Sequence, residues 1–428
     1  MIEIATTIYL FISFCYIFYF SRKEGPSPSL LWVIFQAVIY VGIAKIADLD
    51  IAADRMLLFL HWIALPIFIL GNCLCNLTHS SRQNKQGEML FYVRNTSLFW
   101  MKCICVITVS FIACIYLYSH APNVIYVLVK SILSSGQIVS IERLRFAFTQ
   151  VRGNGYIYQF RVVLLPLINM AFLLSIDKKY QKIAFLLAPF TVYFLLGTGQ
   201  RGGAVIMFIV FCVNIILFKK YARCTTPKIF YAIVILGAFM FIGLTIANGR
   251  AQISGSVIMA IIDRIFYDNQ YTAIIGFRFI YEQPVQIGYD WLMRIRDILP
   301  WKSGYVPLDF IINDIIYGGM GGTCPPSAVG SIYYNWGSCG TLIFIFFMGY
   351  LYRRIALFFM NNRKNIFDLT FYSFYSVSLG SWMAGDILFL FNDGTIAVLL
   401  LQLLINSFMK KNIAYNHALS TNHGLTNS

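Results

Sequence analysis

Residues 201–220 read RGGAVIMFIVFCVNIILFKK, an almost unbroken apolar stretch with an arginine at one end and two lysines at the other. Between Ala204 and Phe218 only Asn214 is polar. A helix needs about twenty apolar residues to cross the core of a bilayer. We therefore expect residues 203–218 to span a membrane.

The composition of the whole chain agrees with a membrane protein. Of its 428 residues 59% are hydrophobic and 12% are charged, and the mean hydropathy is +0.70. In a soluble domain about a quarter of the residues are charged. Because a surface that faces water needs polar side chains, this shortage of charge excludes an ordinary soluble protein. The ten cysteines lie mostly within apolar runs, which is typical of small buried residues rather than of a disulfide framework.

Apolar runs of similar length recur along the chain. They lie near residues 2–20, 30–47, 56–75, 98–118, 158–176, 182–197, 203–218, 228–247, 338–356, 367–388 and 393–409. We predict an all-α polytopic membrane protein with about eleven transmembrane helices, within a range of about 10–12. The chain forms one transmembrane domain, residues 1–428. This domain contains a large hydrophilic loop at 248–337 and a polar cytoplasmic tail at 412–428.

The placement of lysine and arginine orients the predicted bundle. One side holds 19 of the 33 basic residues and 4 of the 18 acidic residues. Because cytoplasmic loops carry the excess of basic residues, we assign this side to the cytoplasm and the loop at 248–337 to the outside. The formal net charge of +15 then lies wholly on the cytoplasmic side. The basic character therefore indicates topology and not binding to nucleic acid.

The kind of basic residue also differs between the two sides. Lysine makes up 12 of the 19 inner basic residues, whereas arginine makes up 11 of the 14 outer ones. The planar guanidinium group fits phosphate and carboxylate groups. An ion pair with an outer Asp or Glu would explain any single arginine equally well. For the set as a whole, the pattern favours an anionic ligand.

The large outer loop begins with a predicted amphipathic helix between Ser256 and Glu282. Its polar face comprises Arg264, Tyr267, Asp268, Tyr271, Ile275, Arg278 and Glu282. The opposite face is mainly apolar, so we expect the helix to lie on the bundle and to present its polar face outward for binding. Alternatively, the i,i+4 pairs Arg264–Asp268 and Arg278–Glu282 only support a solvated helix.

Aromatic residues stand beside charged residues further along the same loop. They include Asp290, Trp291, Arg294 and Trp301. This mixture is typical of sugar-binding sites, since pyranose rings stack on aromatic faces while hydroxyl groups bind charged partners. A belt of aromatic residues at the membrane interface explains Trp301 equally well.

Two smaller outer features accompany the loop. One is a predicted interfacial helix at 120–140. The other is the turn Gly197-Thr198-Gly199-Gln200-Arg201-Gly202-Gly203 between two spans. Its glycines let backbone N–H groups approach an anion, which a helix N-terminus also favours. Arg250 can lie at the same depth. The alternative for Arg201 is a short turn with a snorkelling arginine.

With these features the chain resembles the bacterial oligosaccharide repeat-unit polymerases, the Wzy-type O-antigen polymerases. The resemblance rests on the turn at 197–203, the span after it and the long outer loop. It also rests on the run Pro325-Pro326-Ser327 … Tyr333-Tyr334-Asn335-Trp336-Gly337. It implies a GT-C-like membrane glycosyltransferase architecture in the bacterial inner membrane, with the active face in the periplasm.

The resemblance also implies a reaction and its partners. Such an enzyme transfers a growing O-antigen or capsular glycan from undecaprenyl diphosphate onto another carrier-linked repeat unit. The expected partners are the undecaprenyl-diphosphate-linked oligosaccharide, membrane lipid and a chain-length regulator protein, and no cofactor is expected. An O-antigen ligase of similar fold and a lipid-linked oligosaccharide flippase are the alternatives. The paired repeats typical of transporters are not visible in the sequence.

The chemistry suggests a role for each outer residue. A diphosphate leaving group needs positive charge, from a metal ion or from guanidinium groups. The outer segments contain no histidine cluster, so we expect a metal-independent enzyme. We assign the diphosphate to Arg201, Arg250, Arg264 and Arg278. The candidates for the catalytic base are Asp268, Glu282 and Asp290. The glycan is assigned to Tyr267, Tyr271, Trp291 and Arg294.

Overall fold

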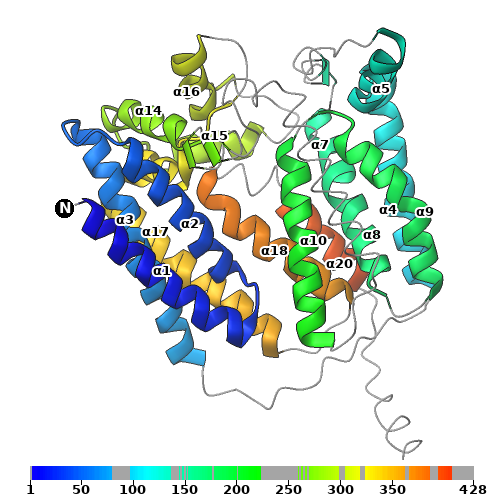
Figure 1. Ribbon diagram of the computed structural model, residues 1–428, viewed down its shortest axis with the longest axis horizontal. Coiled ribbons are helices and arrows are strands. Elements are labelled where there is room, and N and C mark those ends of the chain that lie inside the picture. The colour runs from blue at the N-terminus through cyan, green and yellow to red at the C-terminus, as the bar shows by residue number, and fades with distance from the viewer. Residues whose placement is uncertain are drawn as a thin grey trace, which may run out of the picture.

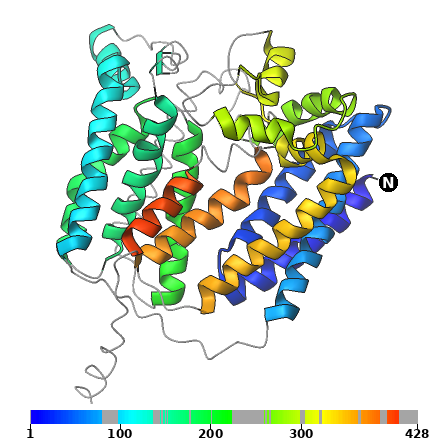
Figure 2. The same ribbon diagram turned by 180° about the vertical axis from the view of Figure 1, so that it is seen from behind.

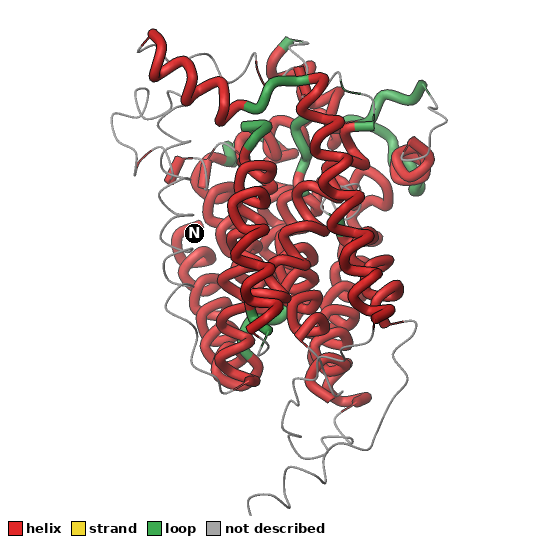
Figure 3. Tube along the Cα trace, turned by 90° about the vertical axis from the view of Figure 1, so that its right-hand side faces the viewer, coloured by secondary structure: helices red, strands yellow, loops and turns green. Residues whose placement is uncertain are grey.

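The structure is a computed structural model. It describes residues 2–79, 97–135, 144, 147–148, 151, 153–175, 178–199, 201–222, 259, 262–263, 266–267, 269–297, 304–318, 323–361, 366–385 and 394–406. Within these residues the chain is helical and has no strand (Figure 3).

The helices follow the order expected from the apolar runs. They are α1 (Ile2–Glu24), α2 (Pro28–Ile46), α3 (Ala52–His79), α4 (Ser97–His120), α5 (Val124–Ser135), α7 (Asn154–Tyr158), the π-helix η2 (Gln159–Leu164), α8 (Leu165–Leu173), α9 (Lys178–Leu196), α10 (Arg201–Ala222), α14 (Asn269–Tyr281), α15 (Tyr289–Asp297), α16 (Leu308–Tyr317), α17 (Ser327–Asn361), α18 (Ile366–Ser381), the 3-10 helix η4 (Trp382–Ala384) and α20 (Thr395–Asn406).

Seven helices among the described residues are long and apolar enough to cross a membrane. These are α1, α2, α3, α4, the continuous α7–η2–α8 helix, α10 and α17. A polytopic all-α membrane protein is thereby confirmed. The predicted spans 182–197, 367–388 and 393–409 coincide with α9, α18 and α20, which do not belong to these seven. The predicted span 228–247 lies outside the described residues, so the count of eleven stays a prediction.

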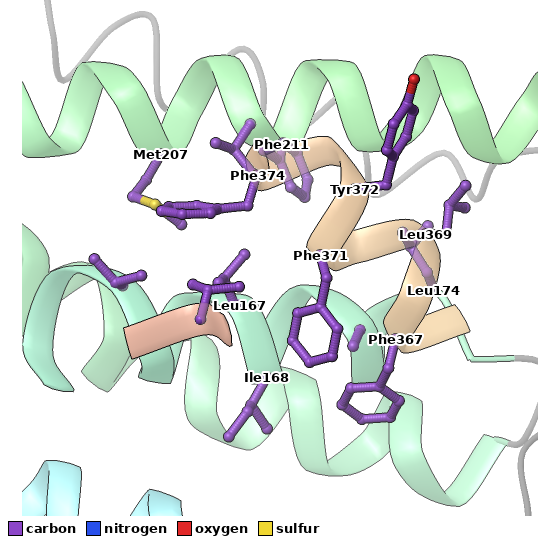
Figure 4. Packing of buried hydrophobic residues seen from close by; sticks show 14 of the residues in the cluster. Leu167, Ile168, Leu174, Met207, Phe211, Phe367, Leu369, Phe371, Tyr372 and Phe374 are labelled. Atoms are coloured by element: carbon purple, nitrogen blue, oxygen red, sulfur yellow. The ribbon is translucent and has the colours of Figure 1, made fainter. Parts of the chain in front are cut away.

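The helices pack in two groups that α18 joins (Figures 1 and 2). The first group contains α1, α2, α3 and α17, and the second contains α4, α8, α9, α10 and α20. Helix α18 packs against α2 of the first group and against α8 and α10 of the second. Each group has its own apolar core. In the first core Trp32 stacks on Phe68 at 3.7 Å between ring centroids, and in the second Phe374 lies beside Met207 (Figure 4).

Glycines allow α3 and α17 to approach closely. A Cβ atom built on Gly71 would lie 2.1 Å from the carbonyl oxygen of Phe346, and one on Gly349 would lie 2.2 Å from that of Phe68. Lipid is as apolar as the side chains, so helices in a membrane associate through close packing at small residues. Gly71 and Gly349 thus hold the first group together.

Basic residues gather at one end of the bundle. Lys220, near the end of α10, donates a hydrogen bond of 3.0 Å to the carbonyl oxygen of Arg22, near the end of α1. Arg353 in the last part of α17 forms a buried ion pair with Glu24. Helices α1, α10 and α17 end here and α9 begins here (Figure 1). We call this the basic end.

Helices α14, α15 and α16 lie at the opposite end, across the ends of α2, α3 and α17 (Figure 1). We call these three helices the outer layer. Helix α5, in the segment predicted as an interfacial helix, lies at the same end of the bundle. The two segments assigned to one side from the sequence therefore share one end of the molecule.

A kink divides α17 where the outer layer meets the bundle. Gly337 has φ 67° and ψ −171°, a backbone conformation that is essentially restricted to glycine. The predicted boundary between loop and span falls at this residue. The residues before it, from Ser327, are also helical.

Candidate functional site

The outer layer contains most of the described residues to which a role was assigned. Helix α14 turns Ala273 and Phe277 toward the bundle, where both are buried. Tyr271 is exposed, and the Arg278 side chain is 38% exposed. The polar and apolar faces of this helix thus lie as the helical spacing predicts.

Arg278 binds Asp54 at the start of α3. Its Nε and Nη2 atoms donate hydrogen bonds of 2.8 Å each to the two carboxylate oxygens. Asp54 is buried and also accepts a hydrogen bond from the backbone of Asp48. The hydrogen bond to Asp54 raises the pKa of Arg278. The sequence suggested Glu282 as the partner of Arg278, and the partner found here comes from a distant part of the chain.

The pairing restricts what Arg278 can do with a ligand. One edge of the guanidinium fork is held by Asp54, and the positive charge is balanced there. Because the side chain is partly exposed, the other edge can still approach an anion from outside. Arg278 is therefore a pre-oriented donor rather than a free positive charge.

A lysine contacts Tyr267, which lies just before α14 in the sequence. Lys45, near the end of α2, donates a hydrogen bond of 2.6 Å to the hydroxyl group of Tyr267. Its Nζ atom also lies 5.0 Å from the centroid of that ring. Lys45 had no role assigned from the sequence.

Asp290 and Arg294 form a buried cluster with Asp309. Arg294 Nε lies 3.3 Å from Asp290 Oδ1, and Arg294 Nη2 lies 2.5 Å from Asp309 Oδ1. Tyr305 donates a further hydrogen bond of 3.0 Å to Asp290. Asp290 and Arg294 are both 0% exposed. We call these four residues the Asp290 cluster.

Burial dominates the electrostatics of the Asp290 cluster. It raises the pKa of Asp309, and the charge of Arg294 acts in the opposite direction. Burial also raises the pKa of Tyr305, and the nearby charge of Asp290 raises it further. One guanidinium group thus faces two carboxylates away from water. The cluster connects α15, the segment before α16 and α16 itself, so its contacts are those of a support for the outer layer.

Trp291 belongs to the same support. Its indole N–H group donates a hydrogen bond of 2.9 Å to Ser331, and its ring packs against Phe344. The side chain is buried. Trp291 and Arg294 were predicted to bind glycan, and in this structure both face the interior rather than a surface that a sugar could reach.

The glycine-containing turn contacts the smaller outer segment. The backbone N–H group of Val124 donates a hydrogen bond of 2.6 Å to the carbonyl oxygen of Gly197. Arg201 is the first residue of α10, at its N-terminal end. Four of the residues with assigned roles are not placed: Arg250, Arg264 and Asp268 lie outside the described residues, as does the side chain of Arg201.

Arg161 is a buried cation that received no role from the sequence. It lies in the π-helix η2, and its Nη1 atom donates hydrogen bonds of 2.9 and 3.1 Å to the carbonyl oxygens of Phe194 and Leu195. These carbonyls belong to the last turn of α9, where a positive charge is favoured. An arginine within an otherwise apolar run was the signal in the sequence.

The site residues offer no ready metal centre within the described residues. No group of three His, Cys, Asp or Glu side chains there is arranged to hold a metal ion. Cys324 and Cys339 form no disulfide within the described part of the chain.

Comparisons of the chain with protein-family models, with curated proteins and with solved structures gave no match. The distances and exposures of the described residues must therefore guide the assignment of roles. Glu282 follows the end of α14 and is exposed. Of the two described carboxylates proposed as a base, only Glu282 can be reached from outside without breaking the Asp290 cluster.

Proposed function

We propose that this protein is a membrane glycosyltransferase. It polymerises undecaprenyl-diphosphate-linked oligosaccharide repeat units into O-antigen or capsular polysaccharide. The observation that supports this proposal most strongly is the outer layer itself. It holds Arg278, Tyr271 and Glu282 on its exposed side, at the end of an apolar bundle that can accommodate a polyprenyl chain. The contrast between outer arginine and inner lysine gives independent support.

The reaction exchanges one bond to the anomeric carbon for another. The hydroxyl group at the non-reducing end of a carrier-linked unit attacks the anomeric carbon of the growing glycan. The bond between that carbon and the phosphate oxygen breaks, and undecaprenyl diphosphate leaves with the electron pair. The proton of the attacking hydroxyl group passes to a base.

Arginines supply the charge that the leaving diphosphate needs. We assign this role to Arg201, Arg250, Arg264 and Arg278. Removing one pre-oriented donor from such a site lowers the rate by about 10²–10³. The pairing of Arg278 with Asp54 supports a fixed orientation, which is what electrostatic stabilisation of a transition state requires.

Glu282 is our first choice for the base among the described residues. It is exposed and lies one turn of helix beyond Arg278. Asp290 stays a weaker candidate because its carboxylate accepts hydrogen bonds from Arg294 and Tyr305. Asp268 completes the set. Tyr267 and Tyr271 are proposed to contact the glycan, with Trp291 and Arg294 supporting the layer beneath.

The full architecture belongs to the same proposal. The protein has about eleven spans in a GT-C-like arrangement and resides in the bacterial inner membrane. The basic end faces the cytoplasm and the outer layer faces the periplasm. The reaction uses no cofactor, and a chain-length regulator protein is the expected protein partner.

Deletion of the gene in its native host tests the proposal. A polymerase mutant makes lipopolysaccharide that carries a single repeat unit in place of a ladder. A mutant with no O-antigen on the core would contradict polymerisation and favour a ligase or a flippase.

Complementation of the deletion then tests the assigned arginine. Wild-type protein should restore the ladder, whereas Arg201→Ala and Arg201→Lys should not, at equal amounts of protein in the membrane. A normal ladder from Arg201→Ala would remove Arg201 from the site without affecting the proposed activity.

A further inference from the structure

The segment 285–288 holds an apolar side chain in an unfavourable backbone conformation. Ile287 has φ 51°, and its side chain is 77% exposed. A positive φ is a true outlier for a β-branched residue. Such strain persists only where the surrounding structure enforces it. The strained backbone conformation therefore costs free energy, and it turns the isoleucine side chain toward the outside of the protein.

The kink in α17 enforces this conformation. The backbone N–H group of Gln286 donates a hydrogen bond of 2.9 Å to the carbonyl oxygen of Tyr334, and that of Gly288 donates one of 3.2 Å to Asn335. The residues before and after Ile287 are therefore both held by hydrogen bonds to the backbone of α17. Gly288 lies so close beneath Trp336 that a Cβ atom would be 2.8 Å from its ring. Ile287 is thus the neighbour in sequence of the glycine that contacts the exposed Trp336.

Helix α15, which follows directly, has its charged side inward and an apolar side outward. Asp290 and Arg294 are buried, whereas Leu292 is 62% exposed and Ile295 is also exposed. Arg296 is exposed at the end of this outward side. A helix against water would expose the charged residues and bury leucine and isoleucine.

The transmembrane part of α17 also has an exposed apolar side. Ile343, Phe347 and Leu351 are exposed there at a spacing of four residues, which places them on one face of the helix. Trp336 directly precedes Gly337, the kink at which this part of α17 begins. Since the exposed face of a membrane-spanning helix meets lipid, Trp336 lies at the depth where the lipid-facing part of α17 begins.

We propose that Ile287, Leu292, Ile295 and Trp336 form a membrane anchor for the outer layer. The anchor inserts into the boundary between headgroups and acyl chains of the phospholipid leaflet at that end. Tryptophan is enriched at this depth, and a short helix with an apolar outer side and a terminal arginine is suited to it. Helix α15 lies at the level of the bundle end, whereas α16 stands farther out (Figures 1 and 2).

The anchor does not depend on the proposed transferase activity. It fixes the outer layer at the membrane surface through α15, while the Asp290 cluster fixes α16 to α15. A ligand with one end in the bilayer would thus meet an outer layer that stays at a fixed distance from the membrane surface. The occupant of the anchor is phospholipid rather than a protein or a glycan.

Photocrosslinking of the full-length protein tests the anchor. The photoreactive residue p-benzoylphenylalanine replaces Ile287 in one variant and Leu292 in a second. Each variant is reconstituted into nanodiscs of phosphatidylethanolamine and phosphatidylglycerol and irradiated, and its intact mass is measured. The same residue in place of Tyr317, exposed at the end of α16, is the matched control.

We expect a mass increase equal to one phospholipid at positions 287 and 292 and none at position 317. Absence of lipid adducts at 287 and 292 would overturn the proposal, and so would equal adducts at all three positions. A cross-linked dimer of the protein in place of a lipid adduct would overturn it as well, because the surface would then bind a second copy. Using two anchor positions guards against loss of folding in either variant.

Discussion

At the scale of single residues, charged side chains of the outer layer divide into supporting and exposed groups. Arg294 is enclosed by two carboxylates, whereas Arg278 has one carboxylate partner and an open side. Both are arginines four residues from an acidic residue in the sequence, so spacing alone does not separate them. What separates them is a contact with Asp309 in one case and with Asp54 in the other, each from another element.

Replacing Arg294 should destabilise the protein strongly. Arg294→Met leaves the carboxylates of the buried Asp290 and the partly buried Asp309 without their cation, which costs about 3–5 kcal/mol. Titration of unfolding with SDS in mixed micelles measures the change in free energy. Arg296→Met, an exposed site on the same helix, is the control and should change it by less than about 0.5 kcal/mol. Equal effects of the two variants would refute the supporting role of the Asp290 cluster.

The stability of the protein should depend on pH through Asp309. Its pKa in the folded state is raised, so the ionised carboxylate lowers stability. This loss of stability is absent when the pH is below the pKa of Asp309 in the unfolded state. It grows as the pH rises toward the pKa of Asp309 in the folded state. Asp309→Asn lacks it, so the unfolding midpoint of the variant should rise relative to wild type as pH increases from about 4 to 7. A constant offset for Asp309→Asn would contradict the expectation.

Arg278 and Asp54 should contribute unequally to activity. Arg278→Ala removes a proposed diphosphate donor and should lower the rate of polymerisation by about 10²–10³. Asp54→Asn leaves the guanidinium group in place and should lower the rate much less. The rates are compared at equal amounts of folded protein in membranes. Equal loss in both variants would mean that the pair is only structural.

At the scale of elements, glycines set how closely the helices pack. Gly71 and Gly349 bring the backbones of α3 and α17 together, and Gly337 bends α17. The apolar runs predicted where these helices lie, because length and apolarity are properties of a single segment. They could not predict which helices pair, because every face of such a run is apolar.

Adding one methyl group between α3 and α17 should weaken the protein. In Gly349→Ala the new Cβ atom meets the carbonyl oxygen of Phe68, and overpacking of this kind costs about 1–3 kcal/mol. Gly155→Ala in α7 meets no atom within 4 Å, so it should be neutral or stabilise by up to about 1 kcal/mol. Unfolding midpoints in detergent compare the two variants. A midpoint for Gly349→Ala at or above that of wild type would refute the close contact.

The outer layer was only partly predictable from the sequence. The amphipathic pattern predicted the orientation of α14, with Phe277 inward and Tyr271 outward. It did not predict the inverted orientation of α15, because burying Asp290 and Arg294 depends on Asp309 and Asn335. The periodic pattern of α15 carries no information about Asp309 and Asn335, because both belong to other helices.

At the scale of the whole molecule, charge separates the two ends. At the basic end Lys220 donates a hydrogen bond to the backbone of Arg22. Among the described residues, Arg278, Arg294 and Arg296 lie in the outer layer at the opposite end. This difference between the two ends was predictable from the basic residues of alternate loops in the sequence. The joining of two helix groups by α18 was not, since helix contacts in a membrane depend on small residues and local hydrogen bonds.

The most direct test of the proposed function uses the purified protein in liposomes with a synthetic undecaprenyl-diphosphate-linked oligosaccharide as the only sugar source. The account predicts products with two, three and more repeat units on the carrier, together with released undecaprenyl diphosphate in equal amount to the bonds formed. Recovery of only the starting single-unit substrate, from protein shown to be folded and inserted, would contradict it.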